Sequence, residues 1–430
     1  QAGVLFLQGV NNQFSKNKSQ TWAKDKKSED VNALFFDADG DKDFDLYVVS
    51  GGNEFKEGNA ALQDRIYIND GKGNFTKGKL PSMKISGGVA KAGDIDSDGD
   101  LDLFVGGRQV SNKYGHQAKS YILINEQGRF TDKTKELAPE LVKPGMVTDA
   151  HWMDIDQDKD EDLIVVGEWM PISIFSYDGK KFNNVTSKYG LQNTSGWWNC
   201  FALEDFDKDG DLDIIAGNLG ENSRIKASNN QPIKIYANDF DGNGTNDIVL
   251  AKYYKDGYVP MRGKECTTQQ MPYVGEKFKD FHSFASSKLI DILPEKKIED
   301  AVIYEISNFK SIILINNDGN LEPQSLPIQA QVSPIKSSIV DDFNNDGFKD
   351  LLLVGNHYGV EVETVRYDAG YGSLFLGDGK NNFTFLSPTS SGVYIPKDSR
   401  FISSIKTTQK QKIYLTTTNN NTISLFKKNN

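Results

Sequence analysis

Cysteine and histidine are scarce in this sequence, which removes several kinds of site at once. Its 430 residues include two cysteines, Cys200 and Cys266, and four histidines. Neither cysteine belongs to a CxxC pair, so the sequence offers at most one disulfide and no cysteine-based zinc or redox centre. No G-x-S-x-G or H-E-x-x-H motif is present, which argues against serine-hydrolase and zinc-protease chemistry.

The sequence also lacks long apolar runs and an excess of basic residues. No stretch of about 18 apolar residues is available to cross a bilayer, so we expect no membrane span. Lysine and arginine number 49 against 60 aspartates and glutamates, a formal net charge of −11. Because nucleic-acid binders concentrate basic residues, we expect no nucleic-acid partner. The chain opens on Gln1 rather than on methionine, so we expect a processed or excised segment, either a monomer or part of a larger chain.

The abundant feature is a repeated aspartate pattern. The nonamer D-x-[DN]-x-[DN]-x-x-x-D occurs six times, at residues 37–45, 94–102, 154–162, 205–213, 239–247 and 342–350. Each nonamer precedes a short apolar run, such as LYVV or LIVV, that is typical of a buried strand. A strand, a turn and a returning strand follow most of these runs, as in RIYINDGKGNF at residues 65–75. One loop, one buried strand and one hairpin together make a four-stranded sheet.

This recurrence predicts an all-β fold, and the repeat length predicts a β-propeller with one blade per repeat. Six nonamers give six blades, and residues 401–429 supply strands for a seventh. We expect one seven-bladed β-propeller domain over residues 1–430, closed by pairing of the N-terminal segment 4–17 with the last blade. Residues 266–298 are expected to form a small helical insertion, and the short interval before the fifth nonamer predicts a reduced blade.

The nonamers carry the ligands that calcium prefers. Positions 1, 3, 5 and 9 offer side-chain oxygens and position 7 a backbone carbonyl, as Ca²⁺ requires at about 2.3–2.6 Å. No histidine or cysteine stands at a ligand position, which disfavours zinc and copper. We therefore predict up to six Ca²⁺ ions as cofactors. The residues at the predicted ligand positions are Asp37, Asp39, Asp41, Asp43 and Asp45; Asp94, Asp96, Asp98, Asp100 and Asp102; Asp154, Asp156, Asp158, Asp160 and Asp162; Asp205, Asp207, Asp209, Asp211 and Asp213; Asp239, Asp241, Asn243, Thr245 and Asp247; and Asp342, Asn344, Asp346, Phe348 and Asp350.

Helical calcium motifs are excluded by the residue at position 12, where an EF-hand needs a bidentate glutamate. The residues found there are Val48, Val105, Val165, Ala216, Leu250 and Leu353. Glycine usually follows position 5, but Lys42 and Lys159 replace it in the first and third nonamers. We expect those two turns to be strained or more weakly occupied.

The nonamers with their strands and hairpins resemble the FG-GAP or VCBS repeats of integrin α-subunit propellers, over residues 33–426. Three longer phrases, GEWMPISIF, GWWNCFALEDFDKDGDLDIIAGNLGENSRIKAS and VGNHYGVEVETVRYDAGYGSLFLGDG, start at residues 167, 196 and 354. They are similar to the C-terminal VCBS-repeat propeller of bacterial ASPIC/UnbV-associated, cartilage-acidic-protein-like secreted proteins. This resemblance implies a secreted or surface-exposed module without a defined activity. The helical insertion, the two lysine-substituted loops and the lack of a stalk depart from the integrin pattern, so only the calcium roles carry over.

Polar and aromatic residues outside the nonamers are candidates for a ligand face, because propeller ligands often meet the loops at one end of the central channel. The tryptophans either stack on sugar rings or pack between blades. The charged loop residues either bind a ligand or pair with each other, and His151 is expected to be a packed strand residue. The candidates are Trp169, Trp197, Trp198, Asn222, Arg224, His357, Glu361, Arg366 and Tyr367.

No catalytic residue can be nominated, because nearly every clustered carboxylate is assigned to calcium. The sequence favours a non-catalytic calcium-binding β-propeller that acts as an extracellular or cell-envelope interaction module for a protein or glycan. Weak calcium sites fill at roughly 0.1–1 mM Ca²⁺, so we expect a secreted, periplasmic or outer-surface location. Two alternatives are a calcium-dependent carbohydrate-active enzyme, either polysaccharide lyase or hydrolase, and a structural spacer of a larger secreted protein.

Overall fold

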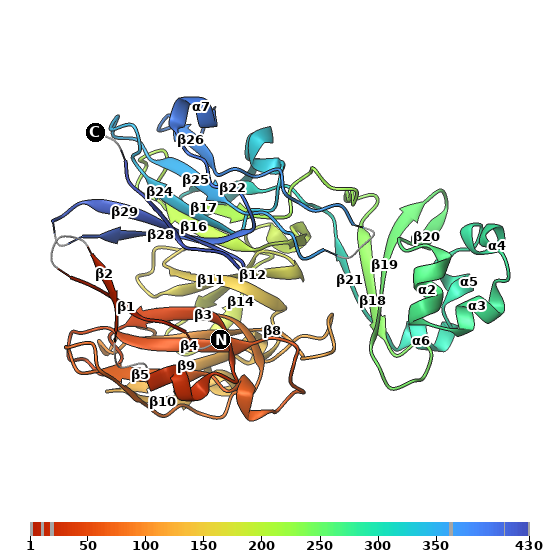
Figure 1. Cartoon of the computed structure of the whole chain (residues 1–430), viewed down its shortest axis with the longest axis horizontal. Coiled ribbons are helices and arrows are strands. Elements are labelled where there is room, and N and C mark those ends of the chain that lie inside the picture. The colour runs from red at the N-terminus through yellow and green to blue at the C-terminus, as the bar shows by residue number, and fades with distance from the viewer. Residues whose placement is uncertain (1–2, 10–12, 18–20, 361–363, 408, 429–430) are drawn as a thin grey trace.

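The computed structural model describes residues 3–9, 13–17, 21–360, 364–407 and 409–428, which form mostly strands and few helices. The protein is all-β, as the sequence predicts. Four four-stranded sheets, one five-stranded sheet and one three-stranded sheet, all antiparallel, make up the main array, and a further four-stranded sheet with helices is inserted (Figure 1). Among these residues, no helix has the length and apolar character to span a membrane.

The sheets of the main array are called sheets 1 to 6 in chain order. Sheet 1 contains β3 (Glu29–Phe36), β4 (Asp45–Gly51), β5 (Arg65–Asn69) and β6 (Phe75–Lys77); sheet 2 contains β7 (Ser86–Gly93), β8 (Asp102–Gln109), β9 (Tyr121–Glu126) and β10 (Arg129–Asp132); sheet 3 contains β11 (Met146–Met153), β12 (Asp162–Met170), β13 (Ser173–Tyr177) and β14 (Phe182–Asn184), with β15 (Gly196–Trp197) paired to β12. Sheet 4 contains β16 (Cys200–Glu204), β17 (Asp213–Gly217), β22 (Ile312–Asn317) and β23 (Asn320–Ser325); sheet 5 contains β24 (Ser337–Asp341), β25 (Asp350–Val354), β26 (Ser373–Gly377) and β27 (Phe383–Leu386); sheet 6 contains β28 (Ser399–Lys406), β29 (Lys412–Thr418) and β30 (Ser424–Phe426). Short helices α1 (Thr134–Leu137) and α7 (Pro388–Ser391) lie outside the sheets.

Five core clusters of the array lie between successive sheets, and one more packs Trp22 against the outer face of sheet 1. Because side chains of a strand alternate between its two faces, the second strand of a sheet contributes to two cores. In β8, Leu103 packs with Tyr47 of sheet 1, whereas Phe104 packs with Val147 of sheet 3. The second strands are therefore buried on both sides, which explains their continuous apolar runs.

The insertion interrupts sheet 4 between β17 and β22. Its sheet has the order β20 (Gly257–Pro260), β19 (Asp247–Tyr254), β18 (Ile233–Asn238), β21 (Val302–Ile306). Between β20 and β21 the chain forms α2 (Lys264–Gln270), α3 (Tyr273–Lys277), α4 (Phe281–Ala285), α5 (Leu289–Ile292) and α6 (Glu295–Glu299). These helices cover the stretch for which the sequence predicted helix. The insertion projects to one side of the array (Figure 1).

The short interval before the fifth nonamer does not mark a reduced blade, contrary to the sequence prediction. The nonamer at 239–247 joins β18 to β19 of the inserted sheet, which continues into the helices. Sheet 4 is completed only by β22, far along the chain, through the pairing of Ile214 with Leu314. The short interval before the fifth nonamer and the long interval between the fifth and sixth nonamers therefore have one cause, which is a single insertion within sheet 4.

The first and last sheets leave part of the array uncovered. Val31 and Phe35 of β3 are 42% and 47% exposed, and Phe401 of β28 is 51% exposed. The strands β1 (Phe6–Gln8) and β2 (Phe14–Lys16) pair with each other as a separate hairpin. No sheet of the described residues closes on itself, and ring closure through the chain ends and a count of seven blades stay predictions.

Candidate metal centres

The last aspartate of each nonamer begins the second strand of its sheet and is buried. The nonamers are called loops 1 to 6, and their ninth residues are at most 3% exposed. In loop 2, Asp102 Oδ2 accepts the backbone N–H of Ile95 at 2.9 Å, and Asp102 Oδ1 accepts that of Asn125, from the third strand, at 2.7 Å. Loops 1, 3, 4 and 6 repeat both bonds. This aspartate therefore holds the loop and two neighbouring strands together.

Positions 1 and 5 close two turns inside each loop. The carboxylate at position 1 accepts the backbone N–H of position 6, as Asp94 Oδ2 does from Gly99 at 3.1 Å. The side-chain oxygen at position 5 accepts the N–H of position 7, as Asp98 Oδ1 does from Asp100 at 2.8 Å. All six loops make both bonds. The six loops therefore share one backbone conformation.

That conformation requires a left-handed residue at position 6. Gly99 has φ +94°, and the lysines that replace glycine, Lys42 and Lys159, have φ +73° and +81°. A side chain in this region costs roughly 1–2 kcal/mol, so the strain predicted for loops 1 and 3 is confirmed. Position 4 is left-handed in every loop as well, including Ser97 at φ +59° and Gln157 at φ +61°. The residue types at position 4 vary from loop to loop, so this second left-handed position could not be predicted from the sequence.

Carboxylate oxygens converge in loops 1 to 5. In each, three aspartates place one oxygen apiece within 4.8 Å of one another. The groups are Asp37, Asp39 and Asp41; Asp94, Asp96 and Asp102; Asp154, Asp156 and Asp162; Asp205, Asp207 and Asp209; and Asp239, Asp241 and Asp247. In loop 6 the amide of Asn344 stands at position 3. Oxygen clusters of this kind suit hard cations such as Ca²⁺ and Mg²⁺.

Two of these oxygens have no donor of their own. Asp39 Oδ1 in loop 1 and Asp94 Oδ1 in loop 2 are buried without a hydrogen-bond partner among the described residues. An orphaned buried carboxylate oxygen is costly, and a cation coordinated there would satisfy it. Side chains at position 7 lie outside the clusters. Asp100 and Asp211 instead accept the backbone N–H groups of Gln127 and Asp318 at 2.8 and 2.7 Å, which leaves their carbonyls as the predicted ligands.

Burial and neighbouring carboxylates raise the pKa values of the ninth aspartates. Burial raises the pKa of Asp102 to about 7 and those of Asp162 and Asp213 to about 6, and the other aspartates of each loop add to the effect. Burial likewise raises the pKa values of the remaining three. Within the described residues no lysine or arginine forms an ion pair with any of the six. When ionised, these buried aspartates would be stabilised by a positive charge, and no lysine or arginine of the described residues supplies it.

Loop 5 in the inserted sheet differs in its third partner. Asp247 Oδ2 accepts the N–H of Phe240 at 3.0 Å as in the array, but Asp247 Oδ1 accepts Nε2 of Gln270 in helix α2 at 3.2 Å. Asn246, the residue before Asp247, contacts the connection between β8 and β9 of sheet 2. Its Oδ1 lies 3.1 Å from Nε2 of His116, and its Nδ2 donates to the carbonyl of Tyr114 at 3.2 Å. Loop 5 thus joins the inserted sheet to a helix and to the array.

Neighbouring sheets also hold the loops of the array. Asn125 Nδ2 of sheet 2 donates to the carbonyl of Ala38 in loop 1 at 2.9 Å. Asn381 Nδ2 of sheet 5 donates to Asp207 Oδ2 of loop 4 at 2.7 Å. Lys428, which follows sheet 6, donates to the carbonyl of Asp342 in loop 6 at 2.9 Å. Sequence reasoning missed these residues, because each lies far along the chain from the loop that it contacts.

The predicted ligand face divides in the structure. Trp198 is fully buried in the core between sheets 3 and 4, so its role is packing. Trp169 is 4% exposed and lies 5.8 Å from Trp197, centroid to centroid. Trp197 and Tyr367 lie against the same apolar cluster, where Met146 meets the inserted sheet. Three of the predicted face residues therefore border the contact between array and insertion.

The other predicted face residues lie on nearby connections. His357 pairs by its backbone with Tyr367, and the guanidinium of Arg366 lies 5.3 Å from the ring of Tyr358. Asn222 donates to the carbonyl of Val332 at 3.1 Å. Arg224 follows in the linker before β18, and Glu361 lies outside the described residues. His151 is half-buried in β11 and contacts Lys91 Nζ at 3.2 Å.

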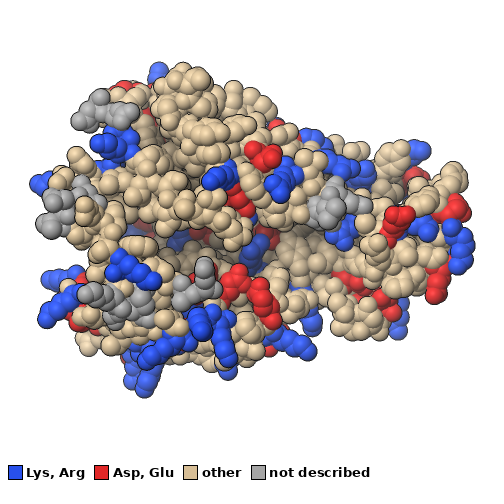
Figure 2. Space-filling view, viewed as in Figure 1, with Lys and Arg blue, Asp and Glu red and all other residues tan. Residues whose placement is uncertain are grey.

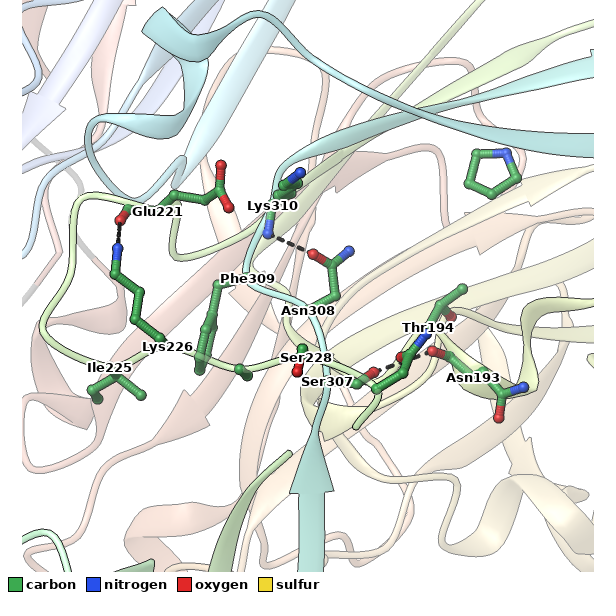
Figure 3. Close-up of a pocket in the computed structure, with 13 residues that line it drawn as sticks. Asn193, Thr194, Glu221, Ile225, Lys226, Ser228, Ser307, Asn308, Phe309 and Lys310 are labelled. Atoms are coloured by element: carbon green, nitrogen blue, oxygen red, sulfur yellow. Dashed lines mark hydrogen bonds between the residues drawn. The ribbon is translucent and has the colours of Figure 1, made fainter. Parts of the chain in front are cut away.

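A pocket of about 380 Å³ opens where the two linkers of the insertion pass each other (Figure 3). Glu221 and Lys226 line it from the first linker, and Ser307 and Lys310 from the second. The Lys226 ammonium donates to the carbonyl of Glu221. Both linkers meet residues from the segment before β15, as in the bond from Ser307 Oγ to the carbonyl of Asn193 at 3.3 Å. The pocket carries no cluster of metal-ligating groups.

The cysteines lie in different units. Cys200 is in β16, Cys266 is in α2, and no disulfide joins them. Burial raises the pKa of the Cys200 thiol to about 12, so this thiol is inert at neutral pH. The single disulfide that the sequence allowed is absent from the structure.

Comparison with known proteins identifies the repeats. The FG-GAP-like repeat family matches residues 37–105, 94–165 and 154–216. Each match starts at the first aspartate of one loop, runs through the next loop and ends in the strand that directly follows it. This confirms the prediction of FG-GAP repeats for this part of the chain. No curated protein matches the chain.

Two solved structures share a distant likeness. The crystal structure of the V. cholerae biofilm matrix protein Bap1 is 10% identical with a TM-score of 0.39, over 93% of this chain and 77% of that one. The crystal structure of BBS1N in complex with ARL6DN, soaked with mercury, is 10% identical with a TM-score of 0.36, over 94% and 93%. At this level neither likeness assigns a fold or function to the chain.

Proposed function

We propose that this protein is a calcium-stabilised FG-GAP repeat module that works outside the cytosol as a non-catalytic binding protein. The observation that carries the proposal is the set of six loops with one conformation, each ending in a buried aspartate that forms no ion pair with a lysine or arginine of the described residues. Ca²⁺ suits the ligand set, because the oxygens come from an irregular loop and Mg²⁺ demands a near-ideal octahedron. Calcium would support the fold rather than a reaction.

The arrangement that we propose for the sheets is a β-propeller. Successive sheets contact each other through their first strands and share cores pairwise. The sheets of the array number six, so a seven-bladed ring requires another unit, such as the β1–β2 hairpin, beside sheet 6. Closure of this kind would cover Val31, Phe35 and Phe401 and remove exposed edges.

The location and the finer family follow from the same reasoning. Loops of the extracellular calcium class fill at roughly 0.1–1 mM Ca²⁺ and are largely empty at cytosolic levels. We propose a secreted, periplasmic or outer-surface location on this ground. The phrases GEWMPISIF and GWWNCFALEDFDKDGDLD carry the proposed relation to ASPIC/UnbV-associated propellers. The partner of such a module would be a protein or a glycan.

Calcium-dependent stability tests the proposal directly. The melting temperature of the full chain would be measured in chelator and in millimolar Ca²⁺, and bound calcium counted by elemental analysis. We expect a large rise in melting temperature with several ions bound per chain, since a ligand at 100 times its Kd stabilises by about 2.7 kcal/mol per site. Equal melting temperatures with no bound metal would contradict the proposal.

One pair of carboxyl groups bears on the alternative that the protein is a glycosidase. Glu29 and Glu54 are hydrogen-bonded to each other, and burial together with this bond raises the pKa of Glu29. A glycosidase holds its two carboxyl groups at least about 5 Å apart, farther than a direct hydrogen bond allows. The pair therefore fits a shared proton at the edge of sheet 1 better than an acid–base pair around a glycosidic bond.

A further inference from the structure

Basic side chains gather at the end of the array opposite the metal loops. Strand β8 begins at the loop aspartate Asp102 and carries Arg108 near its far end. Lys336 directly precedes β24, and Arg400 is the second residue of β28, so both lie at the same far end of strands that run toward the loops. Three cations from sheets 2, 5 and 6 are thereby brought to one end.

Hydrogen bonds connect these sheets at the same level. Thr148 Oγ1 of sheet 3 donates to the carbonyl of Trp198 at 3.0 Å. Lys336 Nζ donates to Asn199 Oδ1, just before sheet 4, at 2.6 Å. The backbone N–H of Ile402 in sheet 6 reaches Ser337 Oγ of sheet 5 at 3.3 Å. The far ends of sheets 3 to 6 are thus tied into one surface.

The charges at this end do not cancel. Arg108 pairs with Glu168 at 2.6 Å, and Arg400 pairs with Asp398 at 2.8 Å. Lys336 forms no ion pair among the described residues, and its Nζ donates to the neutral amide oxygen of Asn199. Burial, with a smaller contribution from the charges of Arg400 and Arg108, lowers the pKa of Lys336 to about 8, although the Glu168 carboxylate acts in the opposite direction. The three cations therefore share two carboxylates, Glu168 and Asp398, and the buried Lys336 ammonium is the one without an ion pair of its own among the described residues.

A polar cleft adjoins these cations. It has a volume of about 380 Å³ and is lined by Arg108 together with the hydrogen-bonded pair Glu29 and Glu54 and with Asn53, Gln109 and Thr148. The side chain of Arg108 is 44% exposed although its partner Glu168 is buried, so part of the guanidinium faces the cleft. Figure 2 shows that the molecule is hollowed near its middle, with acidic and basic side chains along the hollow.

We propose that this end of the array binds an acidic sugar, with the sugar carboxylate held by Lys336 between Arg108 and Arg400. The inference rests on the proposed function as a binding module and names the ligand class. An incoming carboxylate would give the Lys336 ammonium an ion-pair partner of its own, in a setting where charge-assisted bonds are strong. His357, whose Nδ1 lies 3.5 Å from Arg400 Nη2, borders the same cations.

The cleft favours a sugar over an acidic peptide because its lining is polar. Gln109 Nε2 donates to Asn53 Oδ1 at 2.9 Å and Glu29 is hydrogen-bonded to Glu54, and these amides and carboxyls, with the Arg108 guanidinium, have further donors and acceptors for a ring with many hydroxyl groups. Val31 is the one large apolar side chain that lines it. Trp197, half-buried beside the Glu168 carboxylate, is an aromatic platform within reach of the cations. A peptide would be expected to need larger apolar pockets for its side chains.

Calorimetric titration of the calcium-loaded full chain tests the assignment. The probes are a short glucuronate-containing oligosaccharide, the same oligosaccharide with its carboxyls reduced to alcohols, and a short oligoglutamate peptide. We expect Lys336→Met to weaken binding of the acidic oligosaccharide by about tenfold or more, and Arg400→Gln to weaken it as well. Lys412→Met is the matched control, because Lys412 pairs with Asp341 at the loop end of the array, and it should bind like the parent.

Each other outcome overturns the proposal. Absence of binding, equal binding of the reduced oligosaccharide, binding of oligoglutamate alone, or equal loss in Lys336→Met and Lys412→Met would each do so. Melting temperatures confirm that every variant is folded, and Arg400→Gln supplies a second test if Lys336→Met is not. The calcium dependence of melting is measured separately, so a failed sugar site and a failed calcium proposal give different results.

Discussion

Loop 2 of the array and loop 5 of the insertion have one conformation in two settings. In both, the ninth aspartate accepts the N–H of position 2 and the first aspartate accepts that of position 6. In loop 2 the third partner is a backbone N–H of the sheet, whereas in loop 5 it is Gln270 from a helix. The loop conformation is therefore independent of its surroundings. The neighbouring element, a strand in loop 2 and a helix in loop 5, determines which group the buried aspartate binds in addition to its own loop.

Replacing the ninth aspartate should give the largest difference in stability between loop 2 and loop 5. Asp102→Ala leaves two buried backbone N–H groups without acceptors, at about 1–3 kcal/mol each. We expect a loss of roughly 2–5 kcal/mol in the free energy of unfolding, measured by urea denaturation. Asp247→Ala removes one such bond and one to an amide side chain, so its loss should be about half as large. Equal losses in the two variants would contradict the distinction.

Loss of a ligand at position 5 should reduce the gain from calcium. Asp98→Ala removes a carboxylate from loop 2, so we expect a lower melting temperature in calcium and a smaller rise on adding it. Asn243→Ala removes only a neutral amide from loop 5, so its effect on the calcium-induced shift should be smaller. Melting curves in chelator and in millimolar Ca²⁺ measure both. A parent-like shift for Asp98→Ala would exclude loop 2 as a site.

The pH dependence of the calcium-free chain should report mainly on the array. The folded pKa values of Asp102, Asp162 and Asp213, about 7, 6 and 6, lie above the ordinary aspartate value of 3.8. Their protonation therefore stabilises the fold fully below about pH 4, and this contribution is lost as the pH rises through 6 to 7. We expect the melting temperature in chelator to fall between pH 5 and 8.

Calcium should reverse this trend, because it binds the ionised carboxylates and competes with protons. Melting temperatures in millimolar Ca²⁺ should stay level or rise over the same pH range. Asp102→Asn is the matched variant, since it removes the group with the highest of the three pKa values. If the melting temperature of the calcium-free chain rises from pH 5 to 8, the pKa values of these buried aspartates are not raised in the folded state.

The smallest expected effect concerns position 6. Lys42→Gly and Lys159→Gly relieve a left-handed side chain in loops 1 and 3, against the greater flexibility of glycine in the unfolded chain. We expect each to raise the free energy of unfolding by about 0.5–1 kcal/mol. Gly244→Lys in loop 5 should lower it by a similar amount. Denaturation midpoints measure these changes. A loss of stability in both Lys42→Gly and Lys159→Gly would contradict the claim that the backbone is strained at these two residues.

The sequence predicted the elements that depend on neighbours along the chain. The loops, the buried second strands and the outer hairpins all follow from short local patterns, so their positions agree with the structure. The left-handed position 4 was missed, because Ser97, Gln157 and Lys208 share no chemistry that marks it. A backbone conformation imposed by the residues on either side leaves no signal in the residue that adopts it.

Features that depend on distant pairing could not be predicted. The pairing of Ile214 with Leu314 decides that residues between them form an insertion rather than a blade, and no local pattern records it. The burial of Trp198 depends in the same way on the approach of sheet 4 to sheet 3. The cationic end was missed because Arg108, Lys336 and Arg400 are far apart in the sequence and meet only through the order of the sheets.

The interruption of sheet 4 has a consequence for folding during synthesis. Sheets 1 to 3 are each complete once their own residues have left the ribosome, since their strands pair in chain order. Sheet 4 must wait for the whole inserted unit before β22 can reach β17, and until then Ile214 and Ile215 stay without their partners. The nascent chain therefore exposes an unfinished apolar edge at its midpoint, which is the stage at which we expect it to be most prone to aggregation.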